Sequence, residues 1–211
     1  MKKRISLVLG LVMASTAGLA LAQSTAPTVI RGTIVTVSAN TLDLTARDGS
    51  KVEIKLSPSV TVTDIVATQL SAVKPGSYVG TAAVKEPNGQ YRAMELQVFP
   101  EAMRGIGLGT RPWNLTKGSS MTNGTVGAMT QTNGTVGSVA GGGATTLTVN
   151  DGTGTKIVLV PAAVPVVTYE PGTTADLTPG AHVILFAQKD SDGSLATSRV
   201  QVGKDGLTPP M

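Results

Sequence analysis

The chain has 211 residues, with no cysteine, one histidine and 3% aromatic residues, which argues against a disulfide framework or a zinc site with several Cys or His ligands. Its formal net charge is +4, but without Lys2, Lys3 and Arg4 the remaining 14 of the 17 basic residues face 13 acidic ones. This near-neutral balance argues against nucleic-acid binding through bulk charge, and no nucleic-acid partner is expected.

Residues 1–22 have the pattern of a secretory signal peptide. A basic start precedes the mostly apolar stretch 5–20, and the small residues Ala20 and Ala22 stand before Gln23. We expect cleavage near Ala22–Gln23 and a periplasmic or secreted protein. After Gln23 no stretch approaches the roughly 18 apolar residues that a membrane helix needs, so the protein is not expected to span a membrane.

The chain after the leader contains two copies of one unit. Residues 74–98 match 178–202 at a constant offset of 104, and residues 32–56 match 134–160 with small insertions. A match of this length indicates an internal duplication. We expect one domain over 23–101, an irregular connector over 102–131, and a second domain with a C-terminal tail over 132–211.

Each unit is expected to be built from strands. Apolar and polar residues alternate over 41–46, 51–56 and 94–98, and this period of two predicts strands with one buried face. The stretches RDGS and EPNGQ are hairpin turns, because Asp-Gly and Asn-Gly tolerate positive φ. Residues 64–73 could form a short helix, begun by Asp64 as N-cap and ended by Pro75-Gly76.

Three strands, a short connector and two further strands is the order of a small oligomer-binding (OB) barrel. The predicted fold is therefore all-β, with two tandem OB-like barrels related by duplication. In the second unit, KIVLV (156–160) and HVILFA (182–187) are apolar on both faces. Either these strands bend, or this surface packs on the first unit or on a second copy of the chain, which would make a homo-oligomer through the second barrel.

The first strand of the second barrel has two candidates. The sequence TNGTVG occurs at 122–127 and again at 132–137. The later copy fits the repeat better, since Gly134-Thr135-Val136 matches Gly32-Thr33-Ile34.

No catalytic constellation or cofactor is expected, and we predict a protein that is not an enzyme. His182 lies within a predicted strand and lacks the partners that catalysis requires. The glycines of 105–109 precede Pro112 rather than a helix, which argues against a phosphate-binding loop. Asp190 and Asp192 resemble the start of a calcium loop, but the twelfth position holds Gln201, and this stretch matches a hairpin turn in the first unit.

The connector carries the surplus positive charge. From 102 to 150 there are three basic residues, Arg104, Arg111 and Lys117, and no acidic one. Arg104 and Arg111 beside Trp113 could hold a carboxylate, a phosphate or an acidic partner, because Arg presents a planar fork of donors. Alternatively, the segment is a linker whose Trp113 fills the seam between the barrels.

The stretches FPEAMRG and RPW in the connector, MTN and TV after it, VVTYEPG in the second unit and VGKDGLTPPM at the C-terminus resemble a family of bacterial exported proteins with small OB-like domains of unknown function. Similar proteins are often labelled metal ABC transporter permeases, a label that does not fit a chain without several membrane spans. The family's connector reads Gly-Glu-Gly-His-Arg-Pro-Trp. Here Leu108 and Thr110 replace the Glu and the His, whereas Arg111, Pro112 and Trp113 match.

These observations predict an exported, non-enzymatic binding or structural module of the cell envelope. Its candidate binding residues are Arg104, Arg111 and Trp113, and its partner is an envelope protein or an anionic ligand. The alternative is a periplasmic metal-handling accessory protein with Asp190 and Asp192 as oxygen ligands.

Overall fold

The computed structural model describes residues 27–132 and 143–210, which contain strands and single-turn 3-10 helices but no α-helix. The predicted signal peptide lies outside the described residues. The strands are β1 (Thr28–Val37), β2 (Thr41–Ala46), β3 (Lys51–Thr68), β4 (Tyr78–Lys85), β5 (Tyr91–Ala93), β6 (Leu96–Val98), β7 (Gly109–Pro112), β8 (Ser119–Thr132), β9 (Ala144–Asn150), β10 (Thr155–Pro161), β11 (Val166–Pro171), β12 (His182–Lys189) and β13 (Leu195–Gly203). The 3-10 helices are η1 (Leu70–Ala72), η2 (Glu101–Met103), η3 (Thr174–Asp176) and η4 (Lys204–Gly206).

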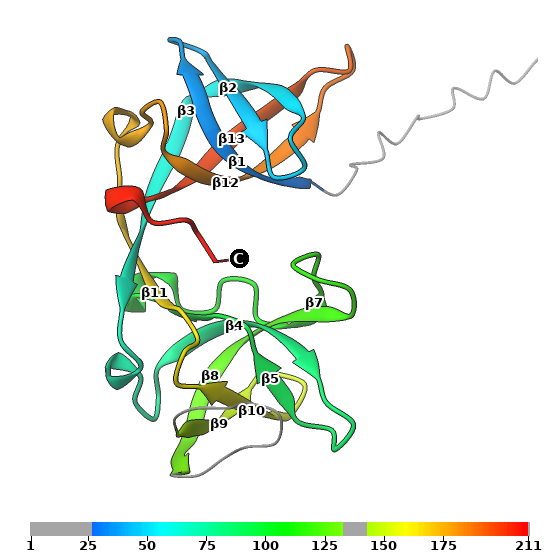
Figure 1. The fold of residues 1–211 in the computed structure, drawn as a ribbon, viewed down its shortest axis with the longest axis vertical. Coiled ribbons are helices and arrows are strands. Elements are labelled where there is room, and N and C mark those ends of the chain that lie inside the picture. The colour runs from blue at the N-terminus through cyan, green and yellow to red at the C-terminus, as the bar shows by residue number, and fades with distance from the viewer. Residues whose placement is uncertain (1–26, 133–142, 211) are drawn as a thin grey trace, which may run out of the picture.

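The strands close into two five-stranded barrels (Figure 1). In barrel A the strands follow the order β1-β2-β3-β13-β12 and β12 pairs back with β1; only the β3–β13 pair is parallel. In barrel B the order is β8-β9-β10-β5-β4, with β4 pairing back with β8 and only β10–β5 parallel. Both barrels have the OB-like strand order, so the all-β, OB-like prediction is confirmed.

The two repeat units exchange strands. Barrel A takes three strands from the first unit and β12 and β13 from the second, whereas barrel B takes three strands from the second unit and β4 and β5 from the first. The expected division into one barrel over 23–101 and another over 132–211 therefore does not match the observed strand pairing. Each barrel contains strands from both repeat units.

The exchange follows from the segment 64–73, which we expected to form a helix. Asp64–Thr68 instead continues β3, and only η1 is helical. The run from Val60 to Thr68 is rich in β-branched residues, whose stiff side chains favour extended backbone. The chain therefore leaves barrel A along an 18-residue strand instead of turning back. Figure 1 shows β3 and β11 running from one barrel to the other along one side of the molecule.

The earlier TNGTVG copy forms the first strand of barrel B, which corrects the expectation that the later copy does so. Residues 122–127 lie in β8, where Thr125 pairs with Tyr78 as Thr33 of β1 pairs with His182. The later copy begins at the end of β8 and lies mainly outside the described residues. The connector is also shorter than expected, because β7 and most of β8 fall within 102–131.

Two equivalent glycines support this assignment. A Cβ on Gly32 of β1 would lie 2.6 Å from the carbonyl oxygen of Thr45, and a Cβ on Gly124 of β8 would lie 2.3 Å from that of Asn150. Real Cβ atoms do not approach backbone this closely, so each barrel requires a glycine where its first strand crosses the second.

Each barrel has its own apolar core, and a third cluster joins them. Leu42, Ile54 and Leu185 are among the residues that fill barrel A, while Leu96, Leu147 and Val158 are among those that fill barrel B. The third cluster comprises Ile65, Tyr78, Phe99, Val167, Tyr169 and Ile184. Burial of each such side chain stabilises the fold by roughly 1.5–3 kcal/mol.

This third cluster explains the run HVILFA. In β12, Val183, Leu185 and Ala187 face the core of barrel A, while Ile184 and Phe186 point to the cluster between the barrels. Packing between the two barrels, rather than bending alone, accounts for the apolar residues on both faces.

Candidate functional site

A cavity of about 570 Å³ lies between the two barrels. Aromatic rings form much of its wall, and they come from Phe99, Trp113, Tyr169 and Phe186. Its polar residues are the amides Gln97, Asn123 and Gln201, the hydroxyl of Thr63, and the guanidinium groups of Arg111 and Arg199. Among the described residues that line it there is no Asp or Glu, so its only formal charges are positive. We call it the central cavity.

The connector brings Arg111 and Trp113 to the central cavity. Strand β7 pairs with β8, and the backbone N–H of Trp113 extends this pairing by donating to the carbonyl of Ser119 at 2.9 Å. The Arg111 guanidinium donates to the carbonyl of Gly107 at 2.8 Å, which holds the side chain over its own loop. Two of the three candidate binding residues therefore lie together in the cavity wall.

The glycine-rich loop before β7 is anchored at Ile106. The carbonyl oxygen of Ile106 accepts hydrogen bonds from the Tyr78 hydroxyl at 3.1 Å and from the Asn123 side-chain amide at 3.0 Å. Gly105 and Gly107 have φ of 88° and 60°, in the region that favours glycine. The glycines therefore shape a tight loop at the edge of the cavity.

Trp113 also joins the two barrels. The guanidinium carbon of Arg31, on β1 of barrel A, lies 5.5 Å from the centroid of the Trp113 ring, and that of Arg111 lies 5.8 Å from it. Both distances are within the range of cation–π attraction. The two alternatives for Trp113, filling the seam and lining a site, are therefore compatible.

Arg104 is not part of the cavity wall. Its guanidinium donates to the Glu101 carboxylate at 2.5 and 2.8 Å and to the carbonyl of Gly76 at 3.0 Å. Its charge is thus paired with Glu101 of η2, and its bond to Gly76 holds the connector against the loop before β4. The structure separates it from Arg111 and Trp113, with which the sequence pattern had grouped it.

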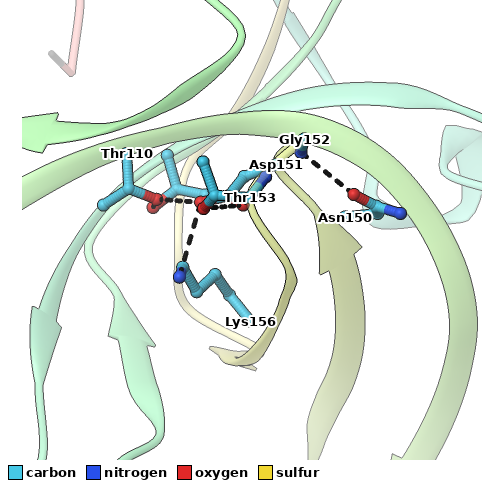
Figure 2. Close-up of polar contacts among 7 residues, drawn as sticks. Thr110, Asn150, Asp151, Gly152, Thr153 and Lys156 are labelled. Carbon is cyan, nitrogen blue, oxygen red and sulfur yellow. Dashed lines mark hydrogen bonds and ion pairs between the residues drawn. The ribbon is translucent and has the colours of Figure 1, made fainter.

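Asp151 holds β7 in place through Thr110 (Figure 2). This buried carboxylate accepts a hydrogen bond from the Thr110 hydroxyl at 2.7 Å and two from Thr153, and Lys156 Nζ lies 3.5 Å from it. Burial alone would raise the pKa of Asp151, but these hydrogen bonds and the Lys156 charge outweigh it and lower the pKa to about 2. Thr110 thus ties β7 to the β9–β10 turn.

A buried carboxylate, Glu95, adjoins the cavity. Its Oε1 accepts the backbone N–H of Ala82 at 2.7 Å and the side-chain amide of Gln97 at 3.0 Å, while its Oε2 is buried without a hydrogen bond. The hydroxyl of Tyr169 donates to the side-chain oxygen of Gln97, Oε1. Burial raises the pKa of Glu95 from 4.5 to about 7, against the Ala82 and Gln97 hydrogen bonds and the Arg31 charge, which lower it.

No protein-family model, curated protein or solved structure matches this chain.

Asp190 and Asp192 lie in the exposed β12–β13 turn. Asp192 accepts hydrogen bonds from Ser194 and pairs with Lys55 Nζ at 3.1 Å, and these contacts lower its pKa. Over residues 27–132 and 143–210, no three His, Cys, Asp or Glu side chains are placed to hold a metal ion. His182 bonds the Thr33 hydroxyl at 3.0 Å through Nδ1, consistent with its expected place in a strand. Within the same residues no helix is long and apolar enough to cross a membrane.

Several cavity residues were missed from the sequence. Tyr169 on β11 and Arg199 on β13 belong to the second unit, and they line the cavity because the strand exchange pairs both strands with β3 of the first unit. One signal was present: Gln97 recurs as Gln201 at the offset of 104, and both line the cavity. A polar residue repeated at the end of the last strand of each unit marks the surface where the two units meet.

Proposed function

We propose that this protein is a non-enzymatic binding module of the cell envelope that takes an organic anion with an apolar body into the central cavity. The observation that carries the proposal is the charge of the wall: Arg111 and Arg199 line it, and none of its described lining residues is acidic. The resemblance of the connector and the C-terminus to exported OB-like proteins supports the envelope location.

The cavity suits a small amphipathic anion. Its volume falls within the roughly 300–1,000 Å³ that small-molecule sites occupy. The rings of Phe99, Trp113 and Phe186 offer apolar surface for a flat or branched body. Each guanidinium offers a fork of donors to a carboxylate, sulfonate or phosphate. Arg111 comes from barrel B and Arg199 from barrel A, so a bound anion would contact both barrels.

Binding rather than catalysis is proposed because of what the wall lacks. The described lining residues include no histidine, cysteine or carboxylate, so no nucleophile lies beside a base.

Two fluorescent probes of similar shape test the proposal. Anilinonaphthalene sulfonate (ANS) is an anion with two ring systems, and N-phenylnaphthylamine is its uncharged counterpart. We expect one ANS per chain, with energy transfer from the single tryptophan, Trp113. Arg111→Gln and Arg199→Gln should each weaken ANS binding about tenfold, the worth of one charge-assisted hydrogen bond, and leave the neutral probe nearly unaffected.

Lys117→Gln is the matched control, because Lys117 is an exposed cation of the same connector that does not line the cavity. Its ANS affinity should equal that of the unaltered protein. Near-UV circular dichroism must show native side-chain packing in every sample, because loosely packed states also bind ANS. Equal losses with all three variants, or no saturable binding, would contradict the proposal.

A further inference from the structure

A series of hydrogen-bonded side chains, Glu95, Gln97 and Tyr169, leads from the buried carboxylate to the central cavity. Glu95 is fully buried, and Gln97 and Tyr169 are 2% and 4% exposed, yet the last two line the central cavity. Burying polar groups costs free energy unless they are hydrogen-bonded. The hydrogen bonds among these three side chains therefore favour one defined set of donor and acceptor directions.

With Glu95 ionised, each direction is determined by what the groups can donate. A carboxylate only accepts, so the Gln97 NH₂ group must point to Glu95 Oε1, at 3.0 Å. The Gln97 oxygen then faces Tyr169 and accepts its hydroxyl hydrogen. In this state the Gln97 amide hydrogen points to Glu95 and the Tyr169 hydroxyl hydrogen points to Gln97. Both hydrogens therefore point into the protein and away from an anion in the cavity.

The charged and titratable groups near Glu95 come from two other strands. Arg31 on β1 favours the ionised carboxylate, and the charge of Arg47 acts in turn on Arg31. Tyr169 on β11 faces the carboxylate, and its burial, followed by the Glu95 charge, raises the pKa of the phenol well above its ordinary value. Tyr169 therefore stays protonated at ordinary pH, and among Glu95, Gln97 and Tyr169 it is Glu95 that can change its charge.

We propose that proton uptake by Glu95 reverses the direction of the hydrogen bonds from Glu95 through Gln97 to Tyr169, so that the cavity wall offers a hydrogen-bond donor to the anion in the cavity. A proton from solvent binds Oε1, which still accepts the Ala82 N–H and now donates to the Gln97 oxygen. The Gln97 amide turns over and donates to the Tyr169 oxygen. The Tyr169 hydroxyl hydrogen is then directed to the ligand.

This inference rests on the proposed function and adds its regulation. If the protonated state binds an anion more tightly, then binding must equally favour protonation, because coupling between two sites is reciprocal. Neutralising Glu95 also removes a negative charge near the bound anion, which acts in the same direction. The affinity of the site for anions would therefore rise as the pH falls through about 7, where Glu95 takes up its proton.

ANS binding measured between about pH 5.5 and pH 8.5 tests the inference, because its sulfonate stays ionised throughout. For the unaltered protein we expect binding about tenfold tighter at the acidic end, as one added charge-assisted hydrogen bond predicts. Glu95→Gln should bind ANS with the same affinity at every pH, since its side chain cannot take up a proton. Tyr169→Phe should lose most of the acidic gain because the terminal donor is gone.

Calorimetry in buffers of different ionisation enthalpy gives an independent measure. A tenfold coupling raises the pKa of Glu95 from about 7 to about 8 on binding, so at about pH 7.5 the unaltered protein should take up roughly half a proton per bound ANS. Glu95→Gln should take up none. His182→Gln should retain the full pH dependence; it is the control because histidine usually titrates in this range. Saturable ANS binding that ignores pH, or proton uptake that survives Glu95→Gln, overturns this inference alone. Absence of ANS binding at every pH overturns the proposed function.

Discussion

Ile65 on β3 lies directly opposite Tyr169 on β11, and the two residues are each other's counterparts in the repeat, 104 positions apart. The parallel pair Leu96–Val166 likewise corresponds to Val200–Val62. An antiparallel pairing of a residue with its own counterpart places a twofold pseudo-axis between them. The two units are thus related by rotation about this point, and the central cavity, with Gln97 and Gln201 in its wall, adjoins Tyr169.

The strand exchange predicts that neither half of the chain folds alone. A fragment of residues 23–101 contains β1, β2 and β3 without the β12 and β13 that close barrel A, leaving open strand edges. We expect the separate fragments 23–101 and 102–211 to show no cooperative thermal unfolding, and an equimolar mixture to regain it. Circular dichroism and gel filtration measure both. A sharp transition in fragment 23–101 by itself would mean that its strands close a barrel of their own.

Glu95 predicts a protein that becomes less stable as the pH rises. Its pKa is raised in the fold, so the folded state holds the proton more tightly than the unfolded chain. The stabilisation is complete below about pH 4.5 and is lost as the pH approaches about 7, a change of roughly 3 kcal/mol in the free energy of unfolding. Urea titrations at several pH values should show this decline in the unaltered protein and its absence in Glu95→Gln. The same slope in both proteins would assign it to another group.

Asp151 and Asp192 form a matched pair, since each is a turn aspartate with Ser or Thr donors and a lysine partner. The Asp151 side chain is fully buried, whereas that of Asp192 is 60% exposed. We expect Asp151→Asn to lower the free energy of unfolding by about 1–3 kcal/mol, because the charge-assisted bonds from Thr110 and Thr153 weaken. Asp192→Asn should leave it nearly unchanged, because exposed ion pairs contribute little.

The pH dependence of the same pair separates them further. The pKa of Asp151 is lowered in the fold, so its stabilisation is present above about pH 4 and is lost as the pH falls toward about 2. Thermal unfolding followed at acidic pH should therefore show a shallower loss in Asp151→Asn than in the unaltered protein. Equal acid sensitivity would show that the Asp151 network does not hold β7.

The contact between Trp113 and Arg31 predicts a measurable coupling between the barrels. The variants Arg31→Ala, Trp113→Leu and their combination form a double-mutant cycle, and we expect a coupling of about 0.5–1 kcal/mol in the free energy of unfolding. A cycle of Trp113→Leu with Lys117→Ala, an exposed cation, serves as the control and should give none. Denaturation followed by circular dichroism measures all variants, because the fluorescence of Trp113 is lost. A coupling near zero would reduce Trp113 to a simple apolar contact.

Only part of the candidate site could be predicted from the sequence. Arg111 and Trp113 were recognised because three cations without an acid stand beside the single tryptophan, and both line the cavity. Arg104 was grouped with them because it is near in sequence, but Glu101, three residues earlier, binds it. Glu95 and Arg199 gave no signal, since a charged residue in an alternating strand normally faces water. Their surroundings come from the other half of the chain.

The sequence by itself determined the all-β class, the duplication and most hairpin turns. These depend on local chemistry: a period of two for one buried face, and glycine where φ is positive. Only the tertiary structure decided which strands share a barrel, because alternation tells which face of a strand is buried and not which strand lies beside it. The extended course of 64–68 carries the chain across to the second barrel. That crossing brings Gln97, Tyr169 and Arg199 around one cavity with the connector's Arg111 and Trp113.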